Sequence, residues 1–195
     1  MKKLKTHNVI LKSILKKNSI KLRPLKEKDW DLLLKWNNDP EVLYYCEEDD
    51  IESRDIEEVK DIYCDVSRKG GLCFMIEYNS KPIGECWLQR MNISRIIKKY
   101  PKLDCRRIDL IIGEKEYWGK GIGTIVIKML TEYGFIKEKV DMIFGLVSDY
   151  NVRSIKAFKS SGYKILSKTK LKKGGKAKYK LDVALKKEEF FKNKK

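Results

Sequence analysis

Three glycines alternate with other residues in the segment Trp118-Gly119-Lys120-Gly121-Ile122-Gly123-Thr124. Glycines let a backbone approach a ligand closely and turn its N–H groups inward. The apolar spacing that follows predicts a helix from Ile122, whose first N–H groups would be unpaired and whose dipole would favour an anion. The segment therefore predicts a cradle for a diphosphate at the N-terminus of a helix.

Two common phosphate-binding loops do not fit this segment. A Walker A loop needs Gly-Lys followed by Ser or Thr, whereas here Lys120 precedes Gly121. A dinucleotide-binding fingerprint that starts at Gly119 needs a glycine where Thr124 stands. The loop also lies past the middle of the chain and follows predicted antiparallel strands, not a first βαβ unit. A different ligand with a diphosphate is therefore expected.

One carboxylate interrupts the apolar run Ile108-Asp109-Leu110-Ile111-Ile112, just before the glycine loop. A carboxylate in such a strand could hold an amine in line for attack and relay its proton, directly or through water. A bound ammonium would stabilise the charged carboxylate, so Asp109 is expected to act chiefly as a positioning group and proton relay. The alternative is a structural aspartate whose hydrogen bonds are satisfied within the fold.

Acidic residues also gather in one short segment between positions 47 and 55. In a protein this basic, such a cluster could hold a cationic substrate. It could equally form an exposed polar loop with N-capping residues. The residues concerned are Glu47, Glu48, Asp49, Asp50, Glu52 and Asp55.

Several other chemistries are disfavoured by the residue types present. His7 is the single histidine and lies in a basic N-terminal stretch, so histidine-based triads and histidine-ligated metals are improbable, and no metal site is expected. The five cysteines are an odd number with no C-x-x-C pair, which favours free thiols in a reducing compartment. Cys86 or Cys105 as a nucleophile is a competing route, although nothing in the sequence indicates a depressed thiol pKa.

The charge balance raises a further hypothesis about partners. The chain has 195 residues, with 44 Lys+Arg against 28 Asp+Glu and a net charge of +16. The lysines are scattered and no nucleic-acid-binding signature accompanies them, so solvated lysine faces are favoured over a nucleic-acid partner. No apolar run approaches the roughly 20 residues that span a bilayer, and the N-terminus lacks a secretory signal pattern. A cytoplasmic monomer or homodimer without a membrane partner is expected.

Hydrophobic periodicity predicts the elements that must position these groups. The predicted order is strand, two helices, three strands, helix, strand, helix and two strands. This order is typical of a single α/β domain with one mixed sheet of about seven strands and four helices. The predicted strands cover 19–25, 72–78, 81–91, 107–112, 142–147, 163–171 and 177–185, and the helices cover 29–36, 56–68, 122–136 and 151–161. Residues 1–18 are predicted to form a basic arm, 19–186 the domain and 187–195 a basic tail.

Residues 19–185 resemble the GNAT N-acetyltransferases. The glycine loop is similar to their Q/R-x-x-G-x-G/A acetyl-CoA loop, with Trp118 in place of the Gln or Arg. Further similarity covers Ile20–Leu25, Trp36–Val42 and Asn151–Tyr163. Within the superfamily, Ile108–Glu114 and the Tyr117-Trp118 that follows are most similar to aminoglycoside 6′-N-acetyltransferases, and the ribosomal-protein N-acetyltransferase branch shares much of this pattern. The resemblance implies a GNAT-like fold and acetyl-CoA as cofactor.

The resemblance also implies roles for individual residues. The glycine loop would hold the CoA pyrophosphate, and the adjacent strand edge would pair with the pantetheine arm and aim an N–H at the thioester carbonyl. The cofactor-binding residues would be Leu110, Ile111, Ile112, Trp118, Gly119, Lys120, Gly121, Ile122, Gly123, Thr124, Asn151 and Phe158. The substrate-binding residues would be Trp36, Glu47, Glu48, Asp49 and Asp109, with Asp109 also the catalytic residue.

Two departures from the family pattern bear on the chemistry. Phe158 stands where many members have a tyrosine that protonates the departing thiolate, so Tyr117, Tyr150 or solvent would have to do this. Leu146-Val147 stand where the aminoglycoside enzymes carry Asp-Pro, and residues 90–107 are basic where their antibiotic-binding loop tends to be acidic. A polycationic antibiotic would lose partners there, and the acidic segment between positions 47 and 55 would have to compensate for them.

Together these features predict an acetyl-CoA-dependent N-acetyltransferase in which a primary amine attacks directly, with no acyl-enzyme. An aminoglycoside 6′-amine is the leading acceptor, which would make the protein an antibiotic-resistance enzyme. A protein or ribosomal N-terminus, a polyamine or another small amine is the alternative. A different class of function is a non-catalytic acyl-CoA-binding or RNA-associated module. Asp109 favours the enzyme, because a pure binder has no reason to place a carboxylate beside the cofactor loop.

Overall fold

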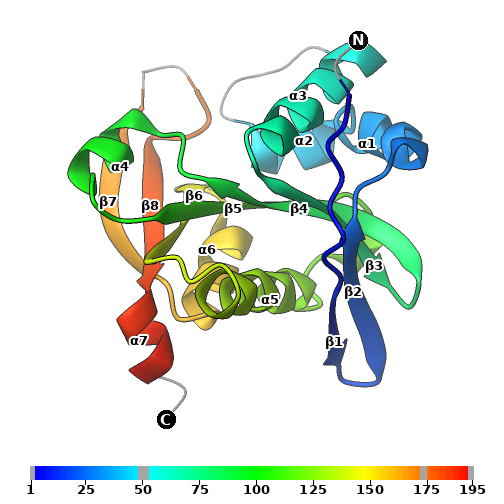
Figure 1. Cartoon of the computed structure of the whole chain (residues 1–195). Helices are drawn as coiled ribbons and strands as arrows, with labels where there is room; N and C mark the ends of the chain where they lie inside the picture. The colour runs from blue at the N-terminus through cyan, green and yellow to red at the C-terminus, as the bar shows by residue number, and fades with distance from the viewer. Residues whose placement is uncertain (1–2, 48–52, 172–174, 193–195) are drawn as a thin grey trace.

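The computed structural model describes residues 3–47, 53–171 and 175–192. Its centre is one mixed sheet with the strand order β1-β2-β3-β4-β5-β6-β8-β7 (Figure 1). The strands are β1 (Leu11–Leu15), β2 (Asn18–Pro24), β3 (Leu72–Tyr78), β4 (Lys81–Arg90), β5 (Cys105–Ile112), β6 (Met142–Ser148), β7 (Lys164–Lys170) and β8 (Tyr179–Lys186). The α-helices are α1 (Trp30–Trp36), α2 (Pro40–Cys46), α3 (Ile56–Arg68), α4 (Ser94–Lys99), α5 (Ile122–Ile136), α6 (Val152–Ser160) and α7 (Lys187–Lys192). The predicted mixed α/β sheet is confirmed.

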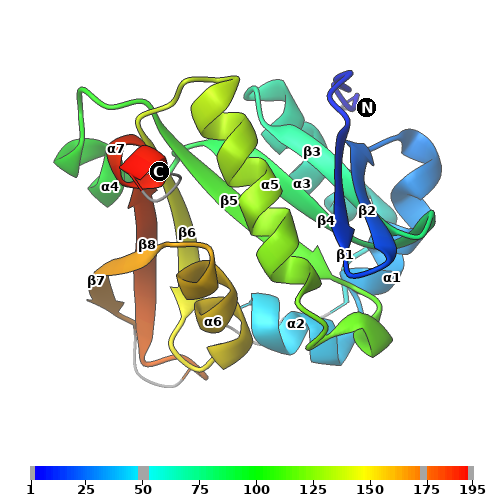
Figure 2. The ribbon, with the colours of Figure 1, turned by 90° about the horizontal axis from the view of Figure 1, so that it is seen from below.

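Helices cover both faces of the central strands. Helices α1, α2 and α3 lie on one face, and α5 crosses the other (Figures 1 and 2). Strand β3 is buried from Cys73 to Glu77, as is expected for a strand covered on both faces. The apolar side of α5 contributes Val126, Ile127 and Leu130 to the larger core cluster. Val126 and Leu130 belong to the apolar spacing from which the sequence predicted this helix, whereas Ile127 was not part of that pattern.

The sheet opens between β5 and β6. These parallel strands pair only at Cys105–Arg107 with Met142–Phe144. Beyond that point Ile108–Ile112 pair with β4 alone, and Gly145–Ser148 pair with β8 alone. One backbone edge of each strand therefore faces the opening rather than a neighbouring strand.

The N-terminal segment is part of the folded unit. Leu4 is buried with α1 and α3, and the backbone N–H of Lys5 donates to Ser67 Oγ at 3.1 Å. Nε2 of His7 lies 3.0 Å from the carbonyl oxygen of Cys73, so the only histidine holds this segment against β3. Strand β1 then pairs with β2 in an antiparallel hairpin. The predicted boundary at 18/19 falls inside this hairpin, which adds an eighth strand to the described sheet.

Three short helices in the described part of the chain were not predicted. Helix α2 begins at Pro40 behind the N-cap Asp39, whose side chain accepts from the N–H groups of Glu41 and Val42. Helix α4 lies within the predicted polar connection, where Ile96 is buried against Phe144 and its neighbours. Helix α7 lies in the predicted tail. With six or seven residues each, these helices are too short to show a clear apolar period.

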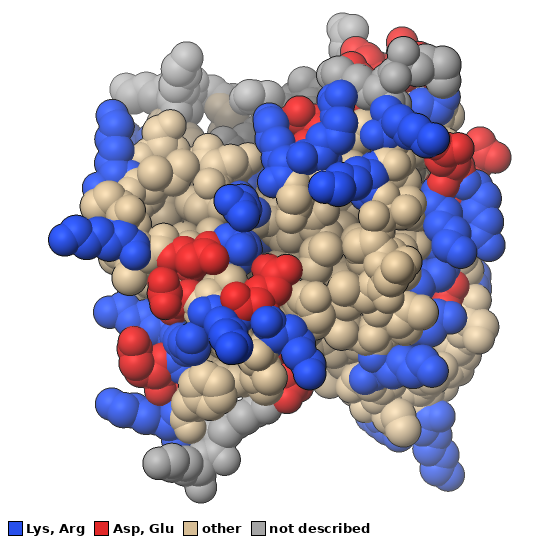
Figure 3. Space-filling view, in the orientation of Figure 1, with Lys and Arg blue, Asp and Glu red and all other residues tan. Residues whose placement is uncertain are grey.

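Charged side chains are dispersed over the surface. Lysine and arginine are spread across the face shown in Figure 3, with acidic side chains among them. This arrangement agrees with solvated lysine faces better than with a single basic stripe. Within the described ranges, none of the helices is long and apolar enough to cross a membrane.

Candidate active site

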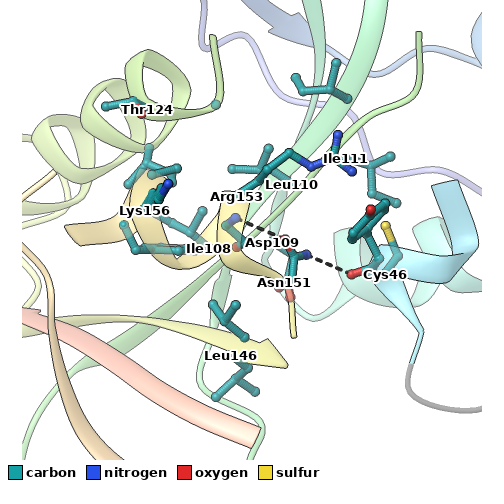
Figure 4. A pocket seen from close by; sticks show the side chains of 18 of the residues that line it. Cys46, Ile108, Asp109, Leu110, Ile111, Thr124, Leu146, Asn151, Arg153 and Lys156 are labelled. Carbon is teal, nitrogen blue, oxygen red and sulfur yellow. Dashed lines mark hydrogen bonds between the residues drawn. The ribbon is translucent and has the colours of Figure 1, made fainter. Parts of the chain in front are cut away.

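A cavity of about 710 Å³ lies where β5 and β6 diverge. Its walls come from the open parts of both strands, the glycine loop, the start of α5, helix α6 and the C-terminal end of α2, with Glu85 and Trp87 of β4 and Lys180 of β8. Figure 4 shows Asp109, Leu110 and Ile111 of β5 on one side and Leu146 of β6 on the other, with Asn151 and Arg153 between the strands and α2. The cavity therefore joins the predicted cofactor loop to the predicted acceptor side.

The glycine loop forms an open cradle at the start of α5. Gly119 and Gly121 have φ angles of +74° and +82°, in the left-handed region that favours glycine. No heavy atom of the described residues lies within 4 Å of the place where a Cβ would stand on either glycine, and both glycines line the cavity. Gly121 is the N-cap of α5 and supplies no side-chain cap, so the first N–H groups of this 15-residue helix are free to bind an anion. The geometry fits a diphosphate.

Trp118 ties the glycine loop to β5 and α6. Its indole Nε1 donates to the carbonyl oxygen of Ile112 at 2.6 Å. The guanidinium of Arg153 lies 4.1 Å from the centroids of both the Trp118 and Tyr45 rings, which pack edge to face against each other. Such cation–π contacts contribute roughly 0.5–1 kcal/mol each at exposed sites. The residue that replaces the family's Gln or Arg therefore has a structural role of its own.

The start of α6 is held against the end of α2. Tyr150 donates its hydroxyl to the carbonyl oxygens of Tyr44 and Glu47, at 2.5 and 3.1 Å. Asn151 Nδ2 donates to the carbonyl oxygen of Tyr45 at 3.0 Å, while its Oδ1 caps α6 by accepting from Ser154. The polar side-chain atoms of Asn151 thus already have protein partners, although the residue lines the cavity as predicted.

Asp109 lies on the face of β5 that points towards α1–α3. Its Oδ2 accepts from Arg107 Nε at 2.7 Å and from Gln89 Nε2 at 2.8 Å. The side chain is 30% exposed and lines the cavity. Asp109 is therefore held as a carboxylate in a fixed orientation at the predicted site, and its charge is partly neutralised by Arg107 before any substrate binds.

Glu85 is a second carboxyl group at the cavity, and it was not among the predicted site residues. It lies on β4, pairs with Ile111 of β5 and is only 2% exposed. Burial, and then the charge of Asp109, raise the pKa of Glu85 well above its ordinary value. The sequence does contain a pattern that could have identified Glu85. It is a lone carboxylate in the largely apolar stretch Pro82–Leu88, just as Asp109 is in its own strand.

The predicted acceptor-side residues fall in three different places. Glu47 lines the cavity and forms an ion pair with Arg54 at 2.7 Å. Glu48 and Asp49 lie outside the described residues. Trp36 is 1% exposed and does not line the cavity; its indole Nε1 donates to Glu114 Oε1 at 2.9 Å. Trp36 therefore anchors the segment after β5 and does not contact the cavity.

Two predicted cofactor residues are also placed differently from the glycines. The Nζ of Lys120 lies 5.0 Å from the centroid of the Tyr117 ring, and Lys120 is not part of the cavity wall. Phe158 is part of the wall but is 4% exposed, and its ring tip packs against Gly145 of β6. A Cβ on Gly145 would lie 2.3 Å from Cζ of Phe158, so the two residues fit closely.

The positions of the cysteines do not support a cysteine as the catalytic nucleophile. Neither Cys86 nor Cys105 lines the cavity. Burial raises the pKa of Cys105 to about 11 and that of Cys86 well above its ordinary value. Cys46 does line the cavity, but desolvation and then Glu85 raise its pKa to about 12. A nucleophilic thiolate needs the opposite shift.

Comparisons with known proteins agree with this geometry. A family model described as an acetyltransferase (GNAT) domain matches residues 19–164. The spermidine N(1)-acetyltransferase of Escherichia coli strain K12 is 25% identical over 150 residues, which are 76% of this chain and 74% of that protein.

Two solved structures share the fold. The aminoglycoside acetyltransferase AAC(6')-Ib in complex with coenzyme A has a TM-score of 0.71 at 17% identity and covers 90% of this chain and 99% of its own. The spermidine N-acetyltransferase from Vibrio cholerae in complex with CoA and spermine has a TM-score of 0.72 at 18% identity. The match covers 88% of this chain and 98% of that one.

Proposed function

Because this chain belongs to the GNAT acetyltransferase family, we propose that it acetylates a primary amine of an aminoglycoside. The general reaction follows from the family: the protein is an N-acetyltransferase that uses acetyl-CoA. The observation that supports an aminoglycoside as the acceptor is that carboxyl groups from three elements line one cavity. These are Glu47 at the end of α2, Glu85 of β4 and Asp109 of β5.

The residues present fit acetyl-CoA. The N–H groups of Gly119, Gly121 and Gly123 would hold the pyrophosphate, because the cradle is open where side chains would otherwise fill it. The edge of β5 at Ile108–Ile112 would pair with the pantetheine arm, since no strand among the described residues occupies that edge. Bound acetyl-CoA supplies an acetyl group activated as a thioester. A backbone N–H on the same edge would stabilise negative charge on the carbonyl oxygen during attack.

Asp109 would hold the amine in line with the open edge of β5. Its carboxylate is oriented by Arg107 and Gln89, and a group fixed in this way can position a reacting atom without further rearrangement. The amine then attacks directly, because the thiols near the site have raised pKa values and none is suited to form an acyl-enzyme.

The lining of the cavity favours an acceptor that carries hydroxyls as well as amines. Arg107, Lys156 and Lys180 line the cavity along with the three carboxyl groups. Arg107 is already paired with Asp109, but hydroxyl oxygens of a sugar can accept hydrogen bonds from Lys156 and Lys180, whereas a polyamine made of methylenes and ammonium groups offers these two cations no acceptor. The AAC(6')-Ib structures with ribostamycin and with kanamycin, both of this fold, add support for a sugar-based acceptor.

A polyamine is the second candidate. The sequence match to a spermidine N(1)-acetyltransferase favours it, because that relative covers three quarters of this chain. Glu85 and Asp109 on one wall could also hold a single ammonium group regardless of the rest of the molecule.

The test is thiol release from acetyl-CoA with a panel of amines. The panel contains two aminoglycosides that differ only in a 6′-amine against a 6′-hydroxyl, together with spermidine and a short peptide with a free N-terminus. The proposal expects the highest kcat/KM for the 6′-amine and a loss of at least about a hundredfold for its 6′-hydroxyl partner. A higher kcat/KM for spermidine or the peptide would overturn the aminoglycoside assignment, and thiol release with no acceptor would contradict the proposed transfer to amines.

A further inference from the structure

The last turn of α2 is held by side chains from the start of α6. The final carbonyl groups of a helix have no N–H partner within the helix. In α2, the carbonyl oxygens of Tyr44 and of the C-cap Glu47 lie 2.5 and 3.1 Å from the hydroxyl of Tyr150, which donates to them. The carbonyl oxygen of Tyr45 accepts from Nδ2 of Asn151 at 3.0 Å, at the end of α2 in Figure 4. The end of α2 is therefore fixed by side chains that lie 106 residues further along the chain.

The turn that carries Tyr150 is anchored to the sheet, whereas α2 buries little of its own surface. Tyr150 lies between β6 and α6, next to Asp149. The N–H of Asp149 donates to the carbonyl oxygen of Tyr179 at 3.0 Å, and its Oδ1 accepts from the N–H of Lys178 at 3.1 Å, which joins the turn to β8. Helix α2 has seven residues, of which only Val42 is buried. The contacts with Tyr150 therefore fix the end of α2 to the turn, and not the turn to α2.

The end of α2 brings Glu47 to the predicted acceptor side of the cavity. Tyr150 fixes the backbone of Glu47, and Arg54 fixes its side chain through an ion pair of 2.7 Å. Arg54 is itself held at the end of α1, where its Nη1 donates to Oδ1 of Asn37 at 3.1 Å. The side chain of Glu47 is 33% exposed and lines the cavity, so a ligand can reach its carboxylate. The two supports hold this carboxylate in place before any acceptor binds.

The hydroxyl and the ring of Tyr150 make separate contacts with α2. A carbonyl oxygen only accepts hydrogen bonds, so the single hydrogen of the hydroxyl is directed at the end of α2. The ring of Tyr150 also lies against the rings of Tyr44 and Tyr45, at centroid distances of 5.4 and 6.5 Å. Removing the hydroxyl alone would therefore leave the aromatic packing in place, which allows the hydrogen bonds to be tested separately.

We propose that Tyr150 is a positioning residue that holds Glu47 where the acceptor binds, an assignment that rests on the proposed function. The hydroxyl of Tyr150 fixes the end of α2, and α2 fixes Glu47. The carboxylate of Glu47 binds a second ammonium group of the acceptor while Asp109 holds the amine that reacts. The enzyme therefore favours acceptors with at least two amines, whose separation matches that of these two carboxylates. A carboxylate that binds a group remote from the reacting amine contributes to the KM of the acceptor and not to kcat.

The test is Tyr150→Phe, which removes the hydroxyl and keeps the ring. The KM for an aminoglycoside with several amines should rise about fivefold, the effect of one lost hydrogen bond, while kcat and the Kd for acetyl-CoA stay unchanged. The rise should be absent in a Glu47→Gln background, because the hydroxyl acts through Glu47. The matched control is Tyr179→Phe, because Tyr179 bonds to the same turn through its backbone but does not line the cavity. It should leave KM, kcat and Kd unchanged.

An unchanged acceptor KM in Tyr150→Phe would overturn the assignment while leaving acetyl transfer intact. A rise in KM of the same size with and without the Glu47 carboxylate, or a rise in the Kd for acetyl-CoA, would also overturn it. Amide hydrogen exchange gives a readout that needs no substrate. The N–H of Glu47, which donates to the carbonyl oxygen of Leu43, should lose protection in Tyr150→Phe, and retained protection would contradict the assignment. Failure of the wild-type protein to acetylate any amine would instead contradict the proposed function.

Discussion

Arg107 and Asp109 share one face of β5, and Nε of Arg107 donates to Oδ2 of Asp109 at 2.7 Å inside the cavity. The carboxylate that we propose holds the amine thus has a cationic neighbour two residues away on its own strand. This pair limits the net negative charge that an arriving amine meets. It also makes Arg107 a determinant of how many positive charges the acceptor can carry.

Replacing Arg107 by methionine should strengthen the binding of multiply charged amines. The variant removes a repulsive cation and releases Asp109, which should lower KM for a polycationic acceptor by about fivefold, equivalent to about 1 kcal/mol for a partly exposed pair. Arg106→Met is the control, because Arg106 pairs with Glu138 at 3.2 Å and does not line the cavity. Initial rates against acceptor concentration would decide. A higher KM in Arg107→Met would show that Arg107 binds the acceptor rather than repelling it.

Gly121→Ala should weaken the binding of acetyl-CoA. Its φ of +82° costs a side-chain-bearing residue roughly 1–2 kcal/mol, and the new methyl group would enter the cradle. We expect at least about a tenfold rise in Kd by calorimetry. Gly70→Ala is a matched control, because Gly70 has a φ of +83° but lies outside the cavity. Both variants should lose similar unfolding free energy, and only Gly121→Ala should lose affinity. Equal Kd values for the two variants would remove the loop from cofactor binding.

Glu114 should stabilise the fold in a pH-dependent way. Burial opposes its ionisation, but hydrogen bonds from Lys35 and Trp36 outweigh this and lower the pKa of Glu114. A carboxyl group with a depressed pKa in the folded state stabilises that state above its unfolded value, near 4.5, and this contribution is lost as pH falls through the folded value. Urea unfolding at pH 7 should show Glu114→Gln less stable by about 1 kcal/mol, with the difference shrinking below pH 4.5.

The control for Glu114 is Glu116→Gln. Glu116 is 54% exposed and pairs with Lys81 at the surface, so its loss should leave the free energy of unfolding nearly unchanged. The difference in free energy of unfolding between wild type and Glu114→Gln could instead stay constant from pH 7 to pH 3. That result would show that the ionised carboxylate of Glu114 is not what stabilises the fold.

Local sequence patterns predicted the long elements and the glycine loop. The bounds of α3 and β3 were predicted to the residue, because the spacing of apolar residues is regular and Gly70-Gly71 separates the two elements. The glycine loop was recognised because its function depends on backbone conformation, which glycine spacing reveals directly. Asp109 stood out for a similar local reason, as a charge within an apolar strand.

The features that escaped prediction depend on contacts between distant segments. Glu85 joins the site only through the register of β4 with β5. Asn151 reaches the carbonyl oxygen of Tyr45 across 106 residues, a contact that fixes the end of α2 at the cavity. Trp36 was expected at the acceptor side, but its ring fills the space beside Gly113, where a Cβ would lie 2.2 Å from it. The lone carboxylate of Glu85 is visible in its apolar stretch, but none of these spatial relationships is encoded in a local pattern.

A crystal structure of this protein with acetyl-CoA is the most direct test of the proposed cofactor site. We expect the pyrophosphate against the N–H groups of Gly119–Gly123, the pantetheine arm between β5 and β6, and the thioester carbonyl oxygen within hydrogen-bond distance of a backbone N–H in Ile108–Ile112. The acetyl group should lie on the side of the cavity lined by Glu85 and Asp109. Acetyl-CoA bound away from the opening between the two strands, or absent from the crystal at saturating concentration, would contradict it.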